Sequence, residues 1–247
     1  MRYGVISDIH SNLEAFESTL SRLGKEGVDG YIFCGDLIGY GPDPEACVQR
    51  YVQLTQQQPV LGVMGNHDAI VVHPELQEYF HFEALRVVEW SLKKLSTPSL
   101  RCISFLPEVI RGENYTVVHG TPRDPLKEYF FNSLQYNALY TEWEGQLLFV
   151  GHTHMPFYME GSMKECKVVS LQEEKTIPLR LPYRYVINPG SVGKPRNSDV
   201  RAAFGIWDTE EQTFTFLREP NDYKQTQEKM KASGLPDFLV ESLSLGL

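Results

Sequence analysis

Five short apolar segments, each ending in a sharp polar turn, constrain the fold more than any other feature of this sequence. They are Tyr3–Ser7, Tyr31–Cys34, Val60–Met64, Tyr115–Val118 and Leu147–Val150. Runs of this length that are rich in β-branched and aromatic residues are typical of strands covered on both faces. Segments with helical periodicity lie between the runs. The alternation therefore predicts an α/β fold in which most strands pair in parallel.

Four helices are expected between these strands. Apolar residues recur at helical spacing from Leu13 to Leu23, and Asn12 is placed to cap that helix. Asp43 followed by Pro44 opens a second helix. A third is expected from about residue 82 to 95, and a fourth from about 133 to 143.

The pattern changes after residue 157, where strands follow one another without long helices. The expected strands are 157–160, 167–171, 183–187, 202–207 and 213–217. We expect them to form a second, more antiparallel sheet packed on the first. Two helices follow, over 222–232 and 237–245. Since no repeat or flexible linker divides the chain, residues 1–247 are interpreted as a single domain.

Composition excludes several classes of protein. The formal charge of −9 over 247 residues argues against binding of polymeric nucleic acid, which requires a basic face. No apolar run is long enough for a membrane span, and the N-terminal residues lack the features of a signal peptide. The four cysteines form no CxxC pair. Reduced thiols in a cytoplasmic protein are therefore expected.

Each of the five apolar runs ends in a turn that carries side chains able to bind a metal ion. These are Asp8, His10, Asp36, Asn66, His119, His152 and His154, with His67 next to Asn66. Loops at the carboxyl ends of strands in an open α/β sheet converge on one crevice. Five of the seven histidines lie in these turns. The pattern predicts one polar pocket with many metal-binding groups.

Each turn alone has a structural explanation. Gly35-Asp36 is common in turns, and a segment such as Asn66–Asp68 can be stabilised by bonds from side chains to the backbone. His119 by itself could be a hydrogen-bonded polar residue. Five matching strand ends together favour the metal site.

The ligand types limit the metal. Imidazole, carboxylate and amide groups without thiolate suit divalent or trivalent ions of Mn, Fe, Zn or Ni. Seven ligands are too many for one ion. If Asp36 bridges, two ions receive four protein ligands each and keep open positions for water and substrate. Two such ions can hold a phosphoryl group and activate a water molecule, so an acidic protein acquires a local anion site.

In this order, the motifs DxH, GD, GNHD, HG and GHTH resemble those of the calcineurin-like metallophosphoesterases. The small bacterial and archaeal phosphodiesterases, often described as diadenosine-tetraphosphatase-like, are the most similar branch. The resemblance covers Asp8 to His154, and the segment Asn188–Gly193 resembles a later loop of that branch.

The resemblance implies a four-layer α/β/β/α sandwich of two mixed sheets. It assigns one metal to Asp8, His10, Asp36 and His154, and the other to Asp36, Asn66, His119 and His152. His67 would face the phosphate and stabilise the transition state. The implied reaction is in-line attack by a metal-bridging hydroxide on a small phosphodiester, phosphomonoester or nucleoside polyphosphate, with a dinucleoside polyphosphate among the candidates.

One stretch departs from the family. Protein phosphatases and symmetrical dinucleotide hydrolases carry GDxVDRG, in which the second Asp orients the catalytic His. Here Gly39 and Tyr40 replace that Asp and its Arg. Protein-phosphatase activity is therefore not expected, and the sequence does not indicate what orients His67.

Substrate contacts beyond the phosphate are less constrained. Arg123 follows the His119 turn, and Lys194 and Arg196 follow Gly193, so these three cations are candidates for phosphate binding. The alternative function is a non-catalytic binding or scaffold protein on the same fold, which lost ligands would support. All seven ligand positions are filled. A metallo-β-lactamase-type hydrolase would require an HxHxDH cluster, which the sequence lacks. An oligomer is compatible with the apolar residues after Phe214.

Overall fold

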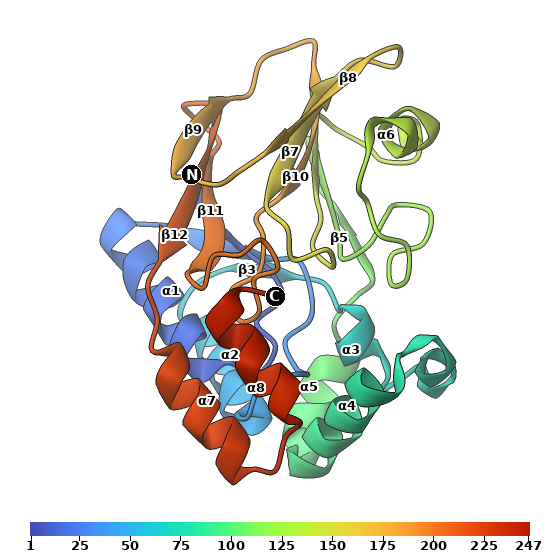
Figure 1. Ribbon diagram of the computed structural model, residues 1–247. Coiled ribbons are helices and arrows are strands. Elements are labelled where there is room, and N and C mark those ends of the chain that lie inside the picture. Colours follow the sequence, from blue (N-terminus) through green and yellow to red (C-terminus); the bar gives the residue numbers. More distant parts are fainter.

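Two six-stranded mixed sheets form the centre of the protein in the computed structural model, which describes residues 1–247 (Figure 1). The strands of the first sheet, from edge to edge, are β3 (Val60–Gly62), β2 (Gly30–Phe33), β1 (Arg2–Ile6), β11 (Ala202–Asp208), β12 (Thr213–Glu219) and β9 (Lys175–Pro178). Those of the second are β4 (Val109–Arg111), β5 (Tyr115–Val118), β6 (Leu147–Phe149), β10 (Arg184–Asn188), β7 (Phe157–Gly161) and β8 (Cys166–Ser170).

Each sheet has a parallel half and an antiparallel half. Strands β1, β2 and β3 pair in parallel, as do β5, β6 and β10. The expected α/β class is confirmed, but the expected division of the strands was wrong. Strands β5 and β6 lie in the second sheet, and the late strands β11 and β12 extend the first by antiparallel pairing with β1. The central strands of each sheet carry apolar side chains on their two faces. The spacing of apolar residues therefore does not indicate which sheet a strand joins.

Alternating side chains of each central strand enter different cores. Val5 packs between the sheets, whereas its neighbour Ile6 packs under the helices that cover the first sheet. Phe149 likewise lies between the sheets, whereas Leu148 packs with Tyr136 of the helix on the second sheet. Successive side chains of a strand point to opposite faces, so these apolar runs require a cover on each side. The result is the four-layer α/β/β/α sandwich.

The helices lie mostly outside the sheets and toward one end of them (Figure 1). They are α1 (Leu13–Glu26), α2 (Pro44–Gln57), α3 (Asn66–Ala69), the 3-10 helix η1 (Pro74–Tyr79), α4 (Phe82–Lys94), α5 (Thr97–Ser104), α6 (Ser133–Leu139), α7 (Tyr223–Ala232) and α8 (Asp237–Leu245). The expected cap is present, because Asn12 Oδ1 accepts a hydrogen bond from Ala15 N at 3.1 Å. None of these helices combines the length and apolarity needed to cross a bilayer.

Helix α7 joins the end of the chain to the first turn of α1 and to the residue that precedes α2. Thr226 Oγ1 of α7 donates to Glu14 Oε2 at 3.0 Å, and Lys229 forms ion pairs with Glu14 and Asp43. In Figure 1 α7 lies beside α1 below the ends of the strands, and α8 packs against α7 and against Val87 of α4. They therefore support the same end of the sandwich that carries the polar turns.

Candidate metal centre

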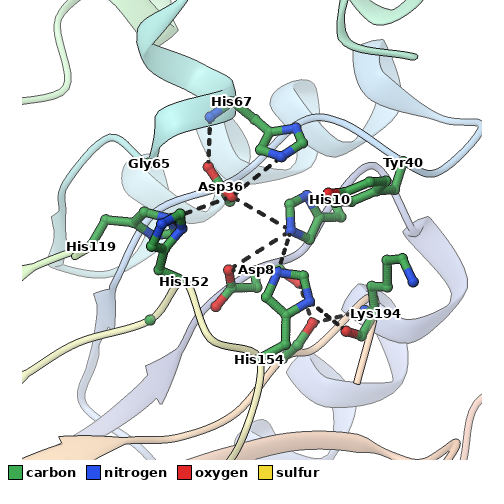
Figure 2. A network of polar contacts seen from close by, with 12 residues as sticks. Asp8, His10, Asp36, Tyr40, Gly65, His67, His119, His152, His154 and Lys194 are labelled. Atoms are coloured by element: carbon green, nitrogen blue, oxygen red, sulfur yellow. Dashed lines mark hydrogen bonds and ion pairs between the residues drawn. The ribbon is translucent and has the colours of Figure 1, made fainter. Parts of the chain in front are cut away.

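The seven side chains predicted as metal ligands converge on one buried site at the carboxyl ends of β1, β2, β3, β5 and β6. Figure 2 shows the carboxylates and imidazoles of this site pointing toward one another. They form two groups that could each hold a metal ion: Asp8, His10, Asp36 and His154 in one, and Asp36, His119 and His152 in the other. Asp36 belongs to both groups. Residues up to 146 positions apart in the sequence therefore meet, as the strand-end pattern predicted.

In the first group, the ring nitrogens and carboxylate oxygens that could bind a metal all lie within 4.8 Å of one another. His10 Nε2 lies 3.0 Å from His154 Nε2 and 3.5 Å from Asp36 Oδ2. Asp8 Oδ1 lies 3.3 Å from His154 Nε2. Four potential donors are therefore gathered within the reach of one cation.

The second group has the same character. His119 Nε2 lies 3.4 Å from Asp36 Oδ2 and 3.1 Å from His152 Nδ1. Asn66 Oδ1 is also 3.1 Å from His119 Nε2, so it adds a fourth donor. One atom, Asp36 Oδ2, is thus close to His10 on one side and to His119 on the other.

Backbone carbonyl groups fix the orientation of each imidazole from behind. The Nδ1 atoms of His10, His119 and His154 lie 3.0, 2.8 and 2.6 Å from the carbonyl oxygens of Ile38, Cys34 and Lys194. A carbonyl oxygen can only accept, so each Nδ1 carries a hydrogen, and Nε2 is the ring nitrogen that faces the site. His152 is reversed: its Nε2 lies 3.4 Å from the Lys127 carbonyl oxygen, and its Nδ1 faces the site.

The backbone of the ligand loops adopts an uncommon conformation. Asp8, His10, Asp36, His152 and His154 all have φ between 49° and 66°, a region in which residues other than glycine are rare. Such conformations persist only where the surrounding structure enforces them, and they cluster at functional sites.

Burial of unpaired acceptors shows that the donor set fits a cation. Both carboxylate oxygens of Asp8 are buried without a hydrogen-bond partner. Burial raises the pKa of Asp8 to about 7, although the nearby His119 imidazole acts in the opposite direction. An uncompensated buried carboxylate is costly, and a metal ion is a natural partner for it. The imidazole, carboxylate and amide donors suit borderline transition-metal ions.

The histidines differ in their titration. Burial lowers the pKa of His10, His152 and His154 well below the usual value for histidine, so these rings are neutral. Burial also acts to lower the pKa of His119, but the Asp36 carboxylate outweighs it and raises that pKa to about 9. Burial acts to raise the pKa of Asp36, yet the neighbouring imidazoles hold it well below its usual value. Asp36 is therefore ionised.

His67 lies beside the cluster but is held differently. Its backbone N–H donates to Asp36 Oδ1 at 2.9 Å, and its Nε2 lies 4.0 Å from Asp36 Oδ2. Its Nδ1 is buried and has no hydrogen-bond partner. The rings of His10, Tyr40 and Phe80 surround it with centroids 4.8, 4.8 and 4.9 Å away. Aromatic packing, rather than a carboxylate, thus orients this imidazole.

Asp68, the next residue, stabilises the loops instead of facing His67. Its carboxylate accepts hydrogen bonds from the backbone N–H groups of Leu37, Ile38 and Gly65 at 3.0–3.1 Å. It therefore joins the loop after β2 to the loop after β3. For Asp68, the structural alternative of bonds from a side chain to the backbone is therefore confirmed.

A cavity of about 200 Å³ opens beside the cluster. Its wall includes Asp36, Asn66, His67, His152 and His154. Arg196 also lines it, and its Nη2 donates to the Tyr40 hydroxyl at 3.3 Å.

The other two candidate cations, Lys194 and Arg123, do not line this cavity. The Lys194 ammonium is buried beneath α8, where it donates to Ser242 Oγ at 3.1 Å and to the Leu247 carbonyl oxygen. Arg123 forms an ion pair of 2.6 Å with Glu128. The expectation that Lys194 and Arg123 face a bound phosphate is therefore corrected, because α8 and Glu128 hold their charges elsewhere.

The cavity also contains residues that sequence reasoning missed. Tyr79, Phe80, Lys127 and Tyr129 all line it. They lie in η1 and in the loop after β5, which carry no recognisable motif. Their position in the sequence, shortly after the turns that carry Asn66 and His119, is the one signal that could have suggested them.

Known proteins resemble this chain along nearly its whole length. Residues 1–212 match the model of the calcineurin-like phosphoesterase superfamily domain. An uncharacterized protein of Methanocaldococcus jannaschii is 34% identical over 249 residues, covering 98% of this chain and 97% of the relative.

Solved structures resemble it as well. The crystal structure of a metallophosphoesterase from Sphaerobacter thermophilus is 34% identical, with a TM-score of 0.88, and the match covers 100% of this chain and 99% of that one. A hypothetical protein from Pyrococcus horikoshii shares the fold at 20% identity and a TM-score of 0.81, over 100% and 98% of the two chains.

Proposed function

This chain belongs to the calcineurin-like phosphoesterase superfamily, and we propose that it hydrolyses a small phosphate ester at a centre of two metal ions. It is a metal-dependent phosphoric ester hydrolase. The observation that carries the dinuclear proposal is the position of Asp36 Oδ2, within 3.5 Å of His10 Nε2 and 3.4 Å of His119 Nε2. A carboxylate shared between two donor groups supports a bridging role.

The two ions are assigned to the two groups of donors. Asp8, His10, Asp36 and His154 would hold one ion, and Asp36, Asn66, His119 and His152 the other. We propose Mn, Fe, Zn or Ni as the metal, in the divalent or trivalent state. When bound, such a pair neutralises phosphoryl charge and supplies a nucleophilic hydroxide at neutral pH.

The chain's own residues position the substrate. His67 Nε2 faces the centre and is placed to donate a hydrogen bond to a phosphoryl oxygen whose charge grows in the transition state. The Arg196 guanidinium enters the cavity wall near Tyr40, where it can contact a second phosphoryl oxygen. The substrates that fit this arrangement are a small phosphodiester, a phosphomonoester or a nucleoside polyphosphate.

We also infer that residues 1–247 act as one domain. Strands β11 and β12 extend the sheet that contains β1, and α7 binds Glu14 of α1 through Thr226 and Asp43 before α2 through Lys229. A non-catalytic scaffold on this fold would not require every ligand, yet all seven are present and face one another. Hydrolysis is therefore the better supported function.

The test combines metal analysis with an activity assay. The protein is purified without chelator, and its metal content is measured by mass spectrometry. Hydrolysis of bis(4-nitrophenyl) phosphate is then followed with added Mn²⁺. We expect Asp36→Asn to lose metal and activity together. We expect His67→Ala to keep the metal and lose about 10²–10³-fold in kcat, as for removal of an oxyanion donor.

Asp237→Asn is the matched control, because Asp237 is an exposed residue of α8 that does not line the cavity. It should behave like the unaltered protein. Activity that survives both substitutions and a chelator would refute the proposal. A protein that binds no metal and hydrolyses no ester would support the scaffold function instead.

A further inference from the structure

The cavity beside the metal ligands has a second part of its wall that is apolar and aromatic. Leu76 and Tyr79 of η1, Phe80, Ala84 of α4 and Leu126 all line it. Leu76 and Leu126 are also members of the main core, so folding accounts for them. Tyr79 is different, because 67% of its surface is exposed and it belongs to no core cluster.

Phe80 brings this apolar wall directly to the reacting centre. Its ring contacts the His67 imidazole edge-on, with centroids 4.9 Å apart. A phosphoryl group held at His67 would therefore place its organic substituent against Phe80 rather than in open solvent. The polar and apolar parts of the cavity are contiguous.

Two cations border the apolar wall. Lys127 Nζ lies 4.7 Å from the centre of the Tyr79 ring and 3.6 Å from Asp124 Oδ2, so it reaches from the loop after β5 to η1. Arg196 lies on the wall as well. The mouth of the cavity thus presents positive charge beside an exposed aromatic ring, a combination suited to an anion that carries a flat apolar group.

The volume limits what can enter. About 200 Å³ is below the roughly 300–1,000 Å³ of sites that enclose a drug-sized ligand. The cavity has room for a phosphoryl group and one ring system. It does not enclose both halves of a dinucleoside polyphosphate, whose second half would lie outside.

We propose that the wall formed by Leu76, Tyr79, Phe80, Ala84 and Leu126 is a subsite for one aromatic ring attached to the phosphate ester, either an aryl group or a nucleobase. The inference rests on the proposed function, since the phosphoryl group is placed at the metal centre. It names the substrate class more narrowly. Phosphate esters with small aliphatic groups should be bound less tightly than those with aromatic ones.

Binding of matched probes to the Mn²⁺-loaded protein tests the subsite without turnover. Phenylphosphonate and methylphosphonate form one pair, which differs only in the ring. The phosphonate analogues of adenosine 5′-monophosphate and ribose 5-phosphate, in which a CH2 group replaces the ester oxygen, form the second pair, which differs in the base. Dissociation constants come from calorimetry. We expect the aromatic member of at least one pair to bind about tenfold more tightly, from the apolar area it buries.

The pair that discriminates identifies the source of the ring. If only the phenylphosphonate pair shows different dissociation constants, the subsite binds an aryl group. If only the adenosine pair does, the subsite binds a nucleobase. Tyr79→Ala should reduce the ratio of the two dissociation constants in that pair at least threefold. Tyr183→Ala is the matched control, because Tyr183 is 43% exposed and does not line the cavity, and it should leave the ratio unchanged.

Equal dissociation constants within both pairs would overturn the inference, as would a ratio that Tyr79→Ala leaves intact. These outcomes are separable from failure of the proposed function. If bis(4-nitrophenyl) phosphate is hydrolysed while the pairs bind equally, only the aromatic subsite is wrong. If that diester is not hydrolysed but the aromatic probes bind selectively, the subsite stands and the catalytic proposal falls.

Discussion

The backbone of Gly39 lies against the imidazole of His67, so closely that a Cβ atom at position 39 would be 2.3 Å from His67 Nδ1. Relatives with the GDxVDRG motif carry an Asp at this position, which orients the catalytic His. In this chain the Nδ1 atom has no hydrogen-bond partner, and aromatic rings hold the imidazole instead. The missing Asp is thus replaced by packing rather than by another carboxylate.

Replacing Gly39 by alanine should therefore damage catalysis without removing the metals. The added methyl group would displace His67, and a misplacement of about 1 Å can cost about 10²-fold in rate. Its φ of +102° adds strain. The measurements are kcat/KM and metal content. Gly24→Ala is the control, because Gly24 lies in helix α1 with no atom within 4 Å of the new methyl group. Equal kcat/KM values for the two variants would contradict the role of Gly39.

Arg196→Gln should weaken substrate binding. Arg196 is the one candidate cation of the three that lines the cavity, and loss of a hydrogen bond from a charged group is worth about tenfold or more in kcat/KM. We expect most of the effect in KM and no change in metal content. Arg180→Gln, a change at an exposed arginine outside this cavity, serves as the comparison. If both variants keep the original KM, Arg196 does not contact the phosphate.

Metal removal should lower the stability of the protein as well as its activity. The buried carboxylates of Asp8 and Asp36 lose their compensation when the site is empty. A ligand at 100 times its Kd stabilises the native state by about 2.7 kcal/mol, which corresponds to roughly 5–10 °C in Tm for a chain of this size. Thermal unfolding with Mn²⁺ and with chelator measures the difference. A Tm that does not respond to metal in the unaltered protein would argue against the site.

The Asp199 carboxylate should contribute stability that is lost in acid. Burial acts to raise its pKa, but hydrogen bonds from Arg201 and the nearby Arg218 keep the pKa below the usual value. Asp199 Oδ2 lies 2.7 Å from Arg201 Nη2 and 3.3 Å from Nε of the buried Arg218. Because the folded pKa is depressed, the contribution is present above the unfolded pKa of about 3.9 and falls as the pH drops through the folded value.

Asp199→Asn should accordingly lower the free energy of unfolding by about 2 kcal/mol near pH 7. This value lies between the effects of breaking an exposed and a buried ion pair. Urea unfolding from pH 7 to pH 3 measures this. We expect the gap between the two proteins to be constant down to about pH 5 and to narrow below pH 4. A gap that persists unchanged at pH 3 would mean that the charge of Asp199 is not its source.

The strand ends and their polar residues were predictable because two simple rules coincide. Apolar runs such as Leu147–Val150 mark strands, and turns such as His152–His154 follow them in the same relation five times. The resulting positions of the donors are those that the structure brings together. Sheet membership was not predictable, because β11 and β6 are apolar on both faces and nothing local states which neighbour each will pair with.

The directions of the side chains that follow Gly193 could not be predicted from the sequence either. Lys194 and Arg196 are two residues apart, yet one ammonium lies beneath α8 and the other cation lines the cavity. The difference depends on Ser242 and Leu247, which are distant in the chain. The aromatic residues of η1 were missed for a similar reason, because a wall that belongs to no motif becomes visible only once the loops are assembled.

The mixed origin of the donors has a mechanical consequence. Asp8, His10, Asp36 and Asn66 follow strands of the first sheet, and His119, His152 and His154 follow strands of the second. Each donor group takes members from both sheets, so neither sheet can assemble a complete coordination sphere by itself. A bound ion would therefore link the two sheets. Any displacement of one sheet relative to the other would change the coordination of both ions at once.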